Sequence, residues 1–429
     1  MVLSIGKLSA GQERYYLEQA GSRVDVVASV AGGVEDYYAG GEEAPGAWVG
    51  AGASRLGLSG SVDAAALRTV LAGSLPGGEP LRAAAVKVAG FDLTFSAPKS
   101  VSVLFGIGDE EVTAAVRGAH DHAVAEALGY LERSAARVRR GAGGTVVLPA
   151  EGLVAAAFRH RTSRLGDPQL HTHVLVANLA HGPDGRWSAL DGRPLYAHAR
   201  AASLIYQAVL RGRLTRVLGV EWTPVREGIA EIDGVPARTL RAFSRRRAQI
   251  EQALRERGLE GPRASEIAAL ATRHAKSPVR TETLLEEWRE RAAVHGFPAK
   301  RISRILGRAT ERQLGEADWE RAFGLLAGPD GLTARRSSFT RRDRLAVPPG
   351  VTSDRGLVPA ARGQCVDLHV ILLCEHPPRD LLLDIDGLDT ADPGGGPRQT
   401  ARAAGIDSGS PPSTPAARSS TRYRPGEFL

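Results

Sequence analysis

Cysteine, lysine and long apolar runs are all scarce in this chain of 429 residues. The two cysteines, Cys365 and Cys374, lie far down the chain, so neither a disulfide framework nor a cysteine zinc site can organise its main body. No uninterrupted apolar stretch approaches the roughly 18 residues of a membrane span, and the first residues lack the apolar core of a secretory signal. We therefore expect a soluble cytoplasmic protein with no insertion into a membrane.

The shortage of lysine excludes one large class of enzymes. Only five of the 55 basic residues are lysines. A P-loop needs Gly-Lys followed by Ser or Thr, whereas the two lysines that precede serine, Lys99 and Lys276, follow Pro98 and Ala275. The sequence therefore contains no P-loop, and we expect neither ATPase nor helicase activity.

The charge and composition of the chain limit the classes of molecule that it can bind. The 55 basic residues exceed the 48 acidic ones, which gives a net charge of +7, and the planar guanidinium of arginine suits phosphate. A GC-rich genome also produces many arginines, so the basic balance permits nucleic-acid binding without proving it. Hydrophobic residues make up 43% of the chain, enough for a sizeable core.

The apolar spacing predicts a mixture of strands and helices. Short apolar runs broken by glycine-rich turns predict strands and loops up to about residue 105, and i+3/i+4 spacing predicts a helix from Asp109 to Arg140. Helical patterns rich in Arg and Glu follow from Pro236 to about residue 330. Between these regions we predict two strands, Gly152–His160 and Leu170–Leu179, joined by a turn at Ser163–Pro168. We predict that a helix follows at Ala197–Leu218 and a short strand region at Glu221–Ile232.

A His-x-His pair is the strongest chemical signal. His171 and His173 lie two residues apart in a predicted strand, so their side chains share one face of a sheet. If the preceding stretch forms a hairpin, His160 lies opposite or diagonal to them, at about 5–8 Å. Three imidazoles at such spacing can bind one divalent metal ion and leave positions open for substrate oxygens. The alternative is a polar patch on an exposed strand face.

A second His-x-His pair does not predict a metal site. His120 and His122 fall in the predicted helix, where residues two apart point about 200° from each other. They cannot bind one ion together, and we interpret them as surface or packing residues.

Two further positions suit phosphate chemistry. Asp92, on a predicted strand, can orient a metal-bound histidine or accept a proton, although it also fits an exposed carboxylate next to a turn. Pro98 is typical of a first helical residue, which places free backbone N–H groups and Lys99 where they can contact phosphate.

Four of the eight tyrosines form two doublets, Tyr15-Tyr16 and Tyr37-Tyr38. A tyrosine oxygen can attack phosphorus to give a phosphotyrosine, and a metal ion on the phosphate compensates for the weak nucleophile. Tyrosine rings also pack in cores and at interfaces. We interpret one ring of each doublet as chemical and its neighbour as structural.

Together these stretches resemble the relaxase domain of F-type conjugative plasmid mobilisation proteins, the TrwC-type relaxases of the His-hydrophobic-His endonuclease superfamily. The matching segments are both tyrosine doublets, Trp48, Leu56–Asp63, Asp92–Ser102 and His160–Asn178. The resemblance covers residues 1 to about 340. It implies an α+β fold with a central antiparallel sheet flanked by helices, a relaxase palm over residues 1–235, and a helical extension over residues 236–330 that closes over single-stranded DNA.

The resemblance also implies roles for particular residues. Tyr15 matches the nicking nucleophile and Tyr37 the tyrosine of the later strand transfer, although the interval between the doublets is longer than the family pattern leads us to expect. Asp92 matches the carboxylate that supports the ligands and can take the tyrosine proton. The metal ligands correspond to His160, His171 and His173. The implied reaction nicks single-stranded DNA at a plasmid transfer origin through a 5′-phosphotyrosyl intermediate, with Mg²⁺ or Mn²⁺ as cofactor.

Candidate phosphate contacts near this site are Lys99, Arg159, Arg161 and Arg164, although flanking arginines also follow from the composition. Accessory relaxosome proteins and type IV secretion coupling proteins are the further candidate partners. Full-length relatives continue into a helicase, and the matching sequence ends near Gly331–Asp343. We therefore expect a truncated or frameshifted relaxase with a low-complexity or disordered tail over residues 331–429.

Three rival functions stay open. A rolling-circle replication initiator would use the same metal and tyrosine chemistry at a replication origin. A DNA-binding remnant would bind without turnover. A cupin-like metal oxygenase also carries His-x-His on a strand, but it needs no phosphotyrosine.

Overall fold

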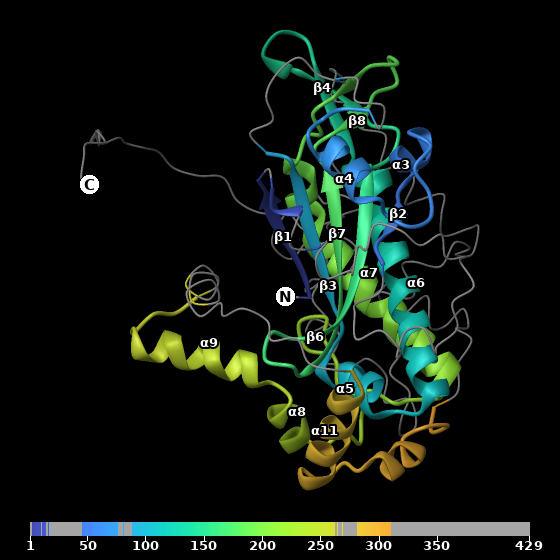
Figure 1. The fold of residues 1–429 in the computed structure, drawn as a ribbon, viewed down its shortest axis with the longest axis vertical. Helices are drawn as coiled ribbons and strands as arrows, with labels where there is room; N and C mark the ends of the chain where they lie inside the picture. The colour runs from blue at the N-terminus through green and yellow to red at the C-terminus, as the bar shows by residue number, and fades with distance from the viewer. Residues whose placement is uncertain are drawn as a thin grey trace, which may run out of the picture. The chain divides into compact units, whose positions relative to one another are not determined.

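A five-stranded antiparallel sheet lies at the centre of the described part of the chain, with the strand order β1-β3-β7-β6-β2 (Figure 1). The computed structural model describes residues 2–9, 11–13, 16, 45–75, 80, 88–261, 264, 268 and 281–309. All of them belong to one compact unit, residues 1–382. The five strands are β1 (Leu3–Leu8), β2 (Ala47–Val49), β3 (Gly90–Ser96), β6 (Ala155–Thr162) and β7 (Pro168–Ala177).

Two long helices, α6 (Glu110–Ala135) and α7 (Arg193–Leu218), pack side by side against one face of this sheet (Figure 1). The carboxylate of Asp109 accepts the Val112 N–H and begins α6, as its spacing predicts. Helix α5 (Lys99–Ile107) joins β3 to α6. Alternate residues of β3, such as Leu93 and Phe95, are fully buried in the core beneath these helices. No helix among the described residues combines the length and the apolar character needed to cross a bilayer.

The other sheet face is divided between an apolar and a polar part. Helices α3 (Ala51–Arg55) and α4 (Ala64–Leu71) contribute to a second apolar cluster, which includes Phe158 of β6 and Leu175 of β7. The sequence reading missed both helices, because short turns between glycines carry little periodicity, although Asp63 caps α4 by accepting the Ala66 N–H. Polar side chains of β3, β6 and β7, among them Asp92, His160 and His171, occupy the other part of this face.

The small β elements lie beyond the central sheet. Strands β4 (Arg137–Arg140) and β5 (Val146–Pro149), joined through η1 (Ala142–Gly144), form one antiparallel pair, and β8 (Ala180–His181) pairs with β9 (Trp187–Ser188). The predicted helix from Asp109 to Arg140 is therefore wrong at its end. Val138 is fully buried and pairs with Leu148, and this pairing outweighs the helical pattern.

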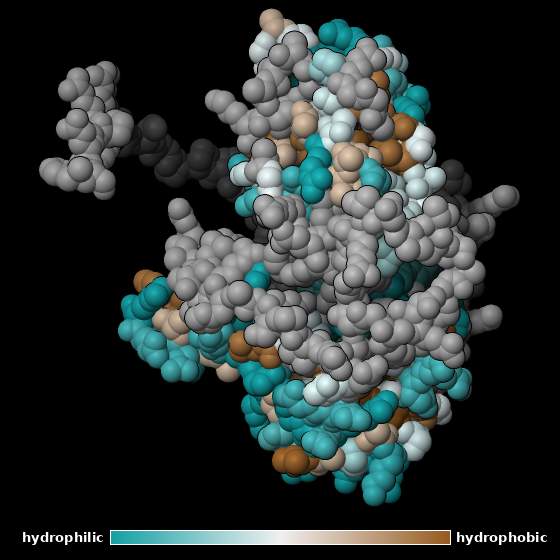
Figure 2. Space-filling model, in the orientation of Figure 1, coloured by the Kyte–Doolittle hydropathy of each residue, from teal (hydrophilic) through white to brown (hydrophobic). Residues whose placement is uncertain are grey.

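The helical region after Pro236 begins where the sequence predicts. It contains α8 (Ala237–Ala242), α9 (Arg245–Glu256), α11 (Thr281–Val294) and the short η2 (Ala299–Arg304). Helix α11 packs on α5, where a Cβ on Gly106 would lie 2.8 Å from the Trp288 ring. Hydrophilic residues cover much of this end of the molecule in Figure 2. We call residues 236–309 the helical extension.

Two further expectations have different outcomes. The predicted strand region Glu221–Ile232 forms only isolated bridges, Trp222 with Ile232 and Arg226 with Ile229. The predicted tail over residues 331–429 lies outside the described residues. The α+β architecture itself is confirmed, while the boundaries at residues 235 and 330 stay predictions.

Helix α7 contains one polar residue that gives a stability prediction. Gln207 is 1% exposed, and among the described residues neither of its amide atoms has a hydrogen-bond partner. We expect Gln207→Met to raise the free energy of unfolding by about 1 kcal/mol, because a buried amide without partners costs more than an apolar side chain of similar size. Urea denaturation measures the change. A clear destabilisation would instead indicate an ordered internal water at this amide.

Candidate metal centre and active site

The hairpin of β6 and β7 brings the three predicted ligands together. His160 pairs directly with His171 in the antiparallel register, and Phe158 pairs with His173. Side chains that face each other across strands lie on the same side of a sheet, so all three imidazoles project from the face opposite α6 and α7. The predicted hairpin is confirmed.

The three imidazoles form a compact triad. Their ring centroids are 5.0–5.2 Å apart in each pairing, and one potential ligand nitrogen from each ring lies within 4.8 Å of the others. Histidine nitrogens bind divalent ions at about 2.0–2.1 Å, so these separations allow one ion to contact all three after small side-chain movements. We call His160, His171 and His173 the His triad.

Hydrogen bonds set the tautomers of two triad members. His171 Nδ1 lies 2.7 Å from the Gln169 carbonyl oxygen, and His173 Nδ1 lies 2.9 Å from Asp92 Oδ1. Both partners can only accept, so Nδ1 carries the proton and Nε2 keeps its lone pair. An outer partner that fixes the ring in this way is typical of metal-binding histidines.

Asp92 connects the triad to the N-terminal segment. Its Oδ2 accepts a hydrogen bond of 2.7 Å from the Tyr16 hydroxyl, and its Oδ1 lies 3.2 Å from Thr94 Oγ1. The Tyr16 ring lies 5.0 Å from the His173 ring and 6.0 Å from that of Phe158. The Tyr16 ring therefore packs in the fold while its hydroxyl reaches Asp92, and the division of the doublet into one chemical and one structural ring stays a prediction.

The environment of Asp92 keeps its carboxylate ionised. Burial raises the pKa of this carboxyl, but hydrogen bonds from His173, Tyr16 and Thr94 and the electrostatic interaction with His173 together outweigh burial, so the pKa lies below its ordinary value. Such a carboxylate is a good acceptor for His173 Nδ1–H and a weak base.

The two tyrosines that we predict to be catalytic, Tyr15 and Tyr37, lie outside the described residues, so their roles stay predictions. Sequence reasoning did not assign site contacts to Tyr16, Thr94 or Gln169. Thr94 and Gln169 could have been found by the period of two that places them on the same strand faces as Asp92 and His171.

The four candidate DNA-binding cations differ in their surroundings. Lys99 Nζ donates to the Pro168 carbonyl at 2.9 Å and to Gln169 Oε1 at 2.6 Å. Burial lowers the pKa of the Lys99 ammonium to about 8, although Asp167 and Glu231 raise it. Lys99 thus supports the start of β7, next to His171.

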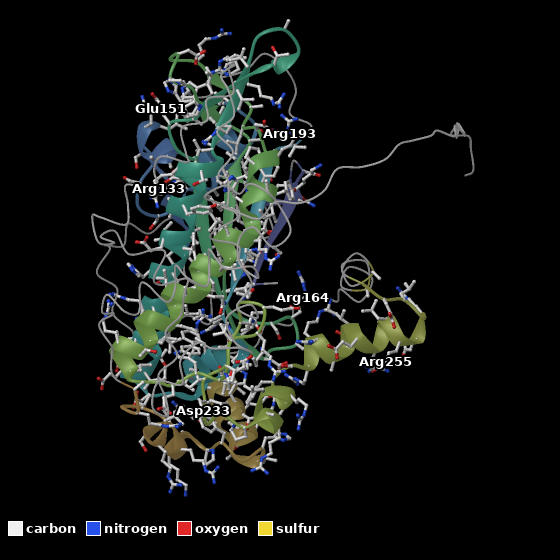
Figure 3. The ribbon with its side chains drawn as sticks, turned by 180° about the vertical axis from the view of Figure 1, so that it is seen from behind. Arg133, Glu151, Arg164, Arg193, Asp233 and Arg255 are labelled. Carbon is white, nitrogen blue, oxygen red and sulfur yellow. The ribbon has the colours of Figure 1, made fainter. Side chains whose placement is uncertain are left out.

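The three arginines lie on or beside β6. Arg159 points to the helix-covered face, where its guanidinium pairs with Asp121 of α6, so its contacts do not support phosphate binding at the His triad. Arg161 is 5% exposed, and Arg164 lies in the turn between β6 and β7 (Figure 3). Contact of Arg161 or Arg164 with phosphate stays a prediction.

A buried polar chain supports β7 from behind. His120 is fully buried, with Nε2 2.7 Å from Thr172 Oγ1 and Nδ1 2.8 Å from the Tyr206 hydroxyl. Thr172 lies between His171 and His173 but faces the helices. His122 is exposed. The interpretation of these two histidines as packing or surface residues is confirmed.

His120 gives a prediction for the pH dependence of stability. Burial, with the nearby charges of Arg159 and His171, lowers the pKa of His120 from 6.5 to about 3. Between these values the unfolded chain binds more protons than the folded one, so stability falls as the pH drops below about 6.5. From pH 7.5 to pH 5 we expect wild type to lose about 2 kcal/mol more than His120→Gln, at about 1.4 kcal/mol per pKa unit. Urea titrations of both proteins test this, and parallel pH profiles would contradict it.

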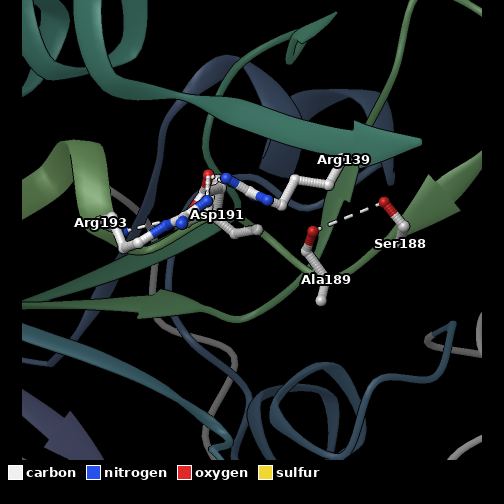
Figure 4. A pocket seen from close by; sticks show the side chains of 6 residues that line it. Arg139, Ser188, Ala189, Asp191 and Arg193 are labelled. Carbon is white, nitrogen blue, oxygen red and sulfur yellow. Dashed lines mark hydrogen bonds and ion pairs between the residues drawn. The ribbon is translucent and has the colours of Figure 1, made fainter. Parts of the chain in front are cut away.

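A separate pocket lies between β4, β9 and the start of α7. Its volume is about 360 Å³, and Asp191 within it accepts bonds of 2.8 Å from Arg139 and from Arg193 (Figure 4). The remaining lining residues are Ser188, Ala189 and Leu190. No member of the His triad lines this pocket.

The fold and site define a class of protein: an antiparallel palm whose central hairpin presents three histidines for a metal ion beside a tyrosine-bonded carboxylate. Residues 9–295 match the TrwC relaxase family. The chain belongs to this family.

Known relatives show the same assignment. The multifunctional conjugation protein TraI of Escherichia coli is 33% identical over 343 residues, which cover 73% of this chain and 19% of TraI. The chain thus matches about a fifth of the length of that relative. A copper-bound structure of the conjugative relaxase TrwC with oriT DNA has a TM-score of 0.59 and 31% identity, and the match covers 69% of this chain and 99% of that one. A TrwC complex with a 27-mer DNA comprising the recognition hairpin and the cleavage site has a TM-score of 0.57 at 30% identity, with the same coverage.

Proposed function

We propose that this chain is a conjugative relaxase, which nicks one strand of DNA at a plasmid transfer origin and forms a 5′-phosphotyrosyl intermediate. The observation that carries the proposal is the His triad, with ligand nitrogens within 4.8 Å of one another on the palm of a TrwC family member. TrwC structures that contain oriT DNA support single-stranded transfer-origin DNA as the substrate. The proposed place of action is the cytoplasm, where plasmid DNA is processed.

Each site residue has a proposed part in the reaction. The Tyr15 oxygen loses its proton and forms a bond to the scissile phosphorus, the bond to the 3′ oxygen breaks, and the 3′ oxygen takes up a proton, so the leaving strand ends in a 3′ hydroxyl. His160, His171 and His173 would hold a divalent ion, whose charge would polarise the phosphate and offset the charge on its oxygens. The phosphotyrosine keeps the energy of the phosphodiester, so rejoining needs no ATP.

Asp92 is proposed to act through His173. Its carboxylate already accepts hydrogen bonds from His173, Tyr16 and Thr94, so it fixes the imidazole more readily than it removes a proton from Tyr15. Tyr37 is proposed as the tyrosine of the second strand transfer.

Mg²⁺ or Mn²⁺ is the proposed ion. Copper is bound in one TrwC structure, which fits the general order of affinities, since imidazole sites bind Cu²⁺ more tightly than Mn²⁺. Affinity in solution therefore does not identify the ion used in cells. The accessory relaxosome proteins and a secretion coupling protein are proposed as further partners.

The test is a covalent adduct. Purified protein is incubated with Mn²⁺ and a labelled single-stranded oligonucleotide that carries the transfer origin of its plasmid, and the products are separated under denaturing conditions. We expect a protein–DNA adduct that EDTA prevents. Tight binding without an adduct would favour the DNA-binding remnant, and cleavage of a replication origin in place of a transfer origin would favour the rolling-circle initiator.

A further inference from the structure

The turn between β6 and β7 contains a buried carboxylate that the proposed reaction does not use. Asp167 is 1% exposed. Its Oδ1 accepts from Arg245 Nε at 2.7 Å and from Arg291 Nη1 at 2.8 Å, and its Oδ2 accepts the backbone N–H of Arg245 at 3.0 Å. Both arginines belong to the helical extension, on α9 and α11. One carboxylate therefore ties two helices of the extension to this turn.

Asp167 also caps the N-terminus of helix α9. Arg245 is its first residue, the preceding Ser244 makes no side-chain cap, and the first turn contains no acidic residue. Asp167 therefore supplies, from a distant part of the chain, the acceptor and the negative charge that a helix N-terminus favours.

The extension also holds the backbone of the turn. Trp288 Nε1 donates to the Gly166 carbonyl at 2.8 Å, and Arg245 Nη2 donates to the Leu165 carbonyl. Gly166 has a φ of 71°, which favours glycine at this position. Thus three consecutive residues of the turn, 165 to 167, accept hydrogen bonds from the extension.

This turn joins the two strands that carry the His triad. The strand register shifts between His160 and Thr162, so the pairing is irregular directly after the first ligand. The next pair is Thr162 with Pro168, three residues before His171. His160 and His171 are thus the last regular pair of the ladder, and on the side of the turn this pair has no regular neighbouring pair to hold it, so contacts of the turn outside the sheet bear on its position.

We propose that Asp167 is a positioning residue of the metal centre: it docks the helical extension onto the β6–β7 turn and thereby fixes the spacing of His160 and His171. The affinity of the triad for a divalent ion then depends on the docked extension. This inference rests on the proposed metal site, but not on the nucleophile or the DNA sequence.

The test compares two arginines of the same helix. Arg245→Gln removes the ion pair with Asp167, whereas Arg247→Gln, two residues further along α9, removes only an exposed pair with Glu251. Mn²⁺ affinity is measured by calorimetry without DNA, and hydrogen exchange is measured over peptides that span β6 and β7. We expect Arg245→Gln and Asp167→Asn to weaken Mn²⁺ binding by about ten-fold, the lower end of the losses seen when groups that hold metal ligands in place are removed. We also expect both variants to speed hydrogen exchange in the turn. Arg247→Gln should stay within about two-fold of wild type, and Arg245→Lys should recover part of the loss.

Thermal unfolding separates this effect from a general loss of stability. At a temperature where every variant is folded, a merely structural role would leave the Mn²⁺ affinity unchanged. If Asp167→Asn does not fold, Arg245→Gln and Arg245→Lys carry the test alone. Unchanged affinity in folded Arg245→Gln would overturn the inference and leave the metal centre intact. A wild-type protein that binds no Mn²⁺ would overturn both.

Discussion

Replacing Tyr15 with phenylalanine is expected to remove the covalent DNA adduct, with a fall in adduct formation of about three orders of magnitude or more. The reason is chemical, because the phenol oxygen is the atom that would bond to phosphorus and phenylalanine carries no substitute. Denaturing gels with a labelled transfer-origin oligonucleotide measure the adduct. Tandem mass spectrometry of the wild-type adduct identifies the modified tyrosine.

Tyr16→Phe is the matched control for this experiment. It changes the adjacent residue by the same single oxygen and removes the 2.7 Å hydrogen bond to Asp92. We expect a slower reaction that still gives the adduct, because the ring packing against Phe158 is kept. An adduct that persists in Tyr15→Phe and maps to Tyr16 or Tyr37 would reassign the nucleophile.

Removal of a triad member has the second large expected effect. We expect His171→Ala to weaken Mn²⁺ binding more than about 100-fold. Removing a group that only supports a ligand typically weakens metal binding by about 10- to 100-fold, and the loss of a ligand itself should cost more. Adduct formation should fall with it and should recover only in part at high Mn²⁺ concentration. Calorimetry and the adduct assay measure the two effects.

His122→Ala serves as the comparison. His122 is exposed on α6 and belongs to the other His-x-His pair. It should bind Mn²⁺ and form the adduct as wild type does. If His171→Ala bound Mn²⁺ with wild-type affinity, the ion would have another site and the proposed role of the triad would be wrong.

The site shows where sequence reasoning succeeds. The period of two placed His171 and His173 on one face, and the turn residues between them and His160 predicted the hairpin. Both features are local, because they depend on strand geometry over a few residues. The same period placed Asp92 on one face of its strand, and the structure brings it to His173 through the pairing of β3 with β7.

Local reasoning failed where distant contacts decide the structure. The stretch Arg137–Arg140 continues a helical pattern, yet it forms a strand because β5 supplies a partner. Arg159 has the charge of a phosphate contact, but the strand register turns it toward Asp121 on α6. The sequence pattern of each segment does not show which distant residues it contacts.

The sequence by itself determined the family to which this protein belongs and the hairpin that brings its three histidines to one strand face, whereas the catalytic roles of the tyrosines stay predictions. Only the tertiary structure decided how the site is held. Tyr16 reaches Asp92 across 76 residues of chain, and Asp167 binds arginines 78 and 124 residues away. The physical reason is that spacing along a strand or helix fixes the directions of neighbouring side chains, whereas contacts between distant segments depend on how all the elements pack together.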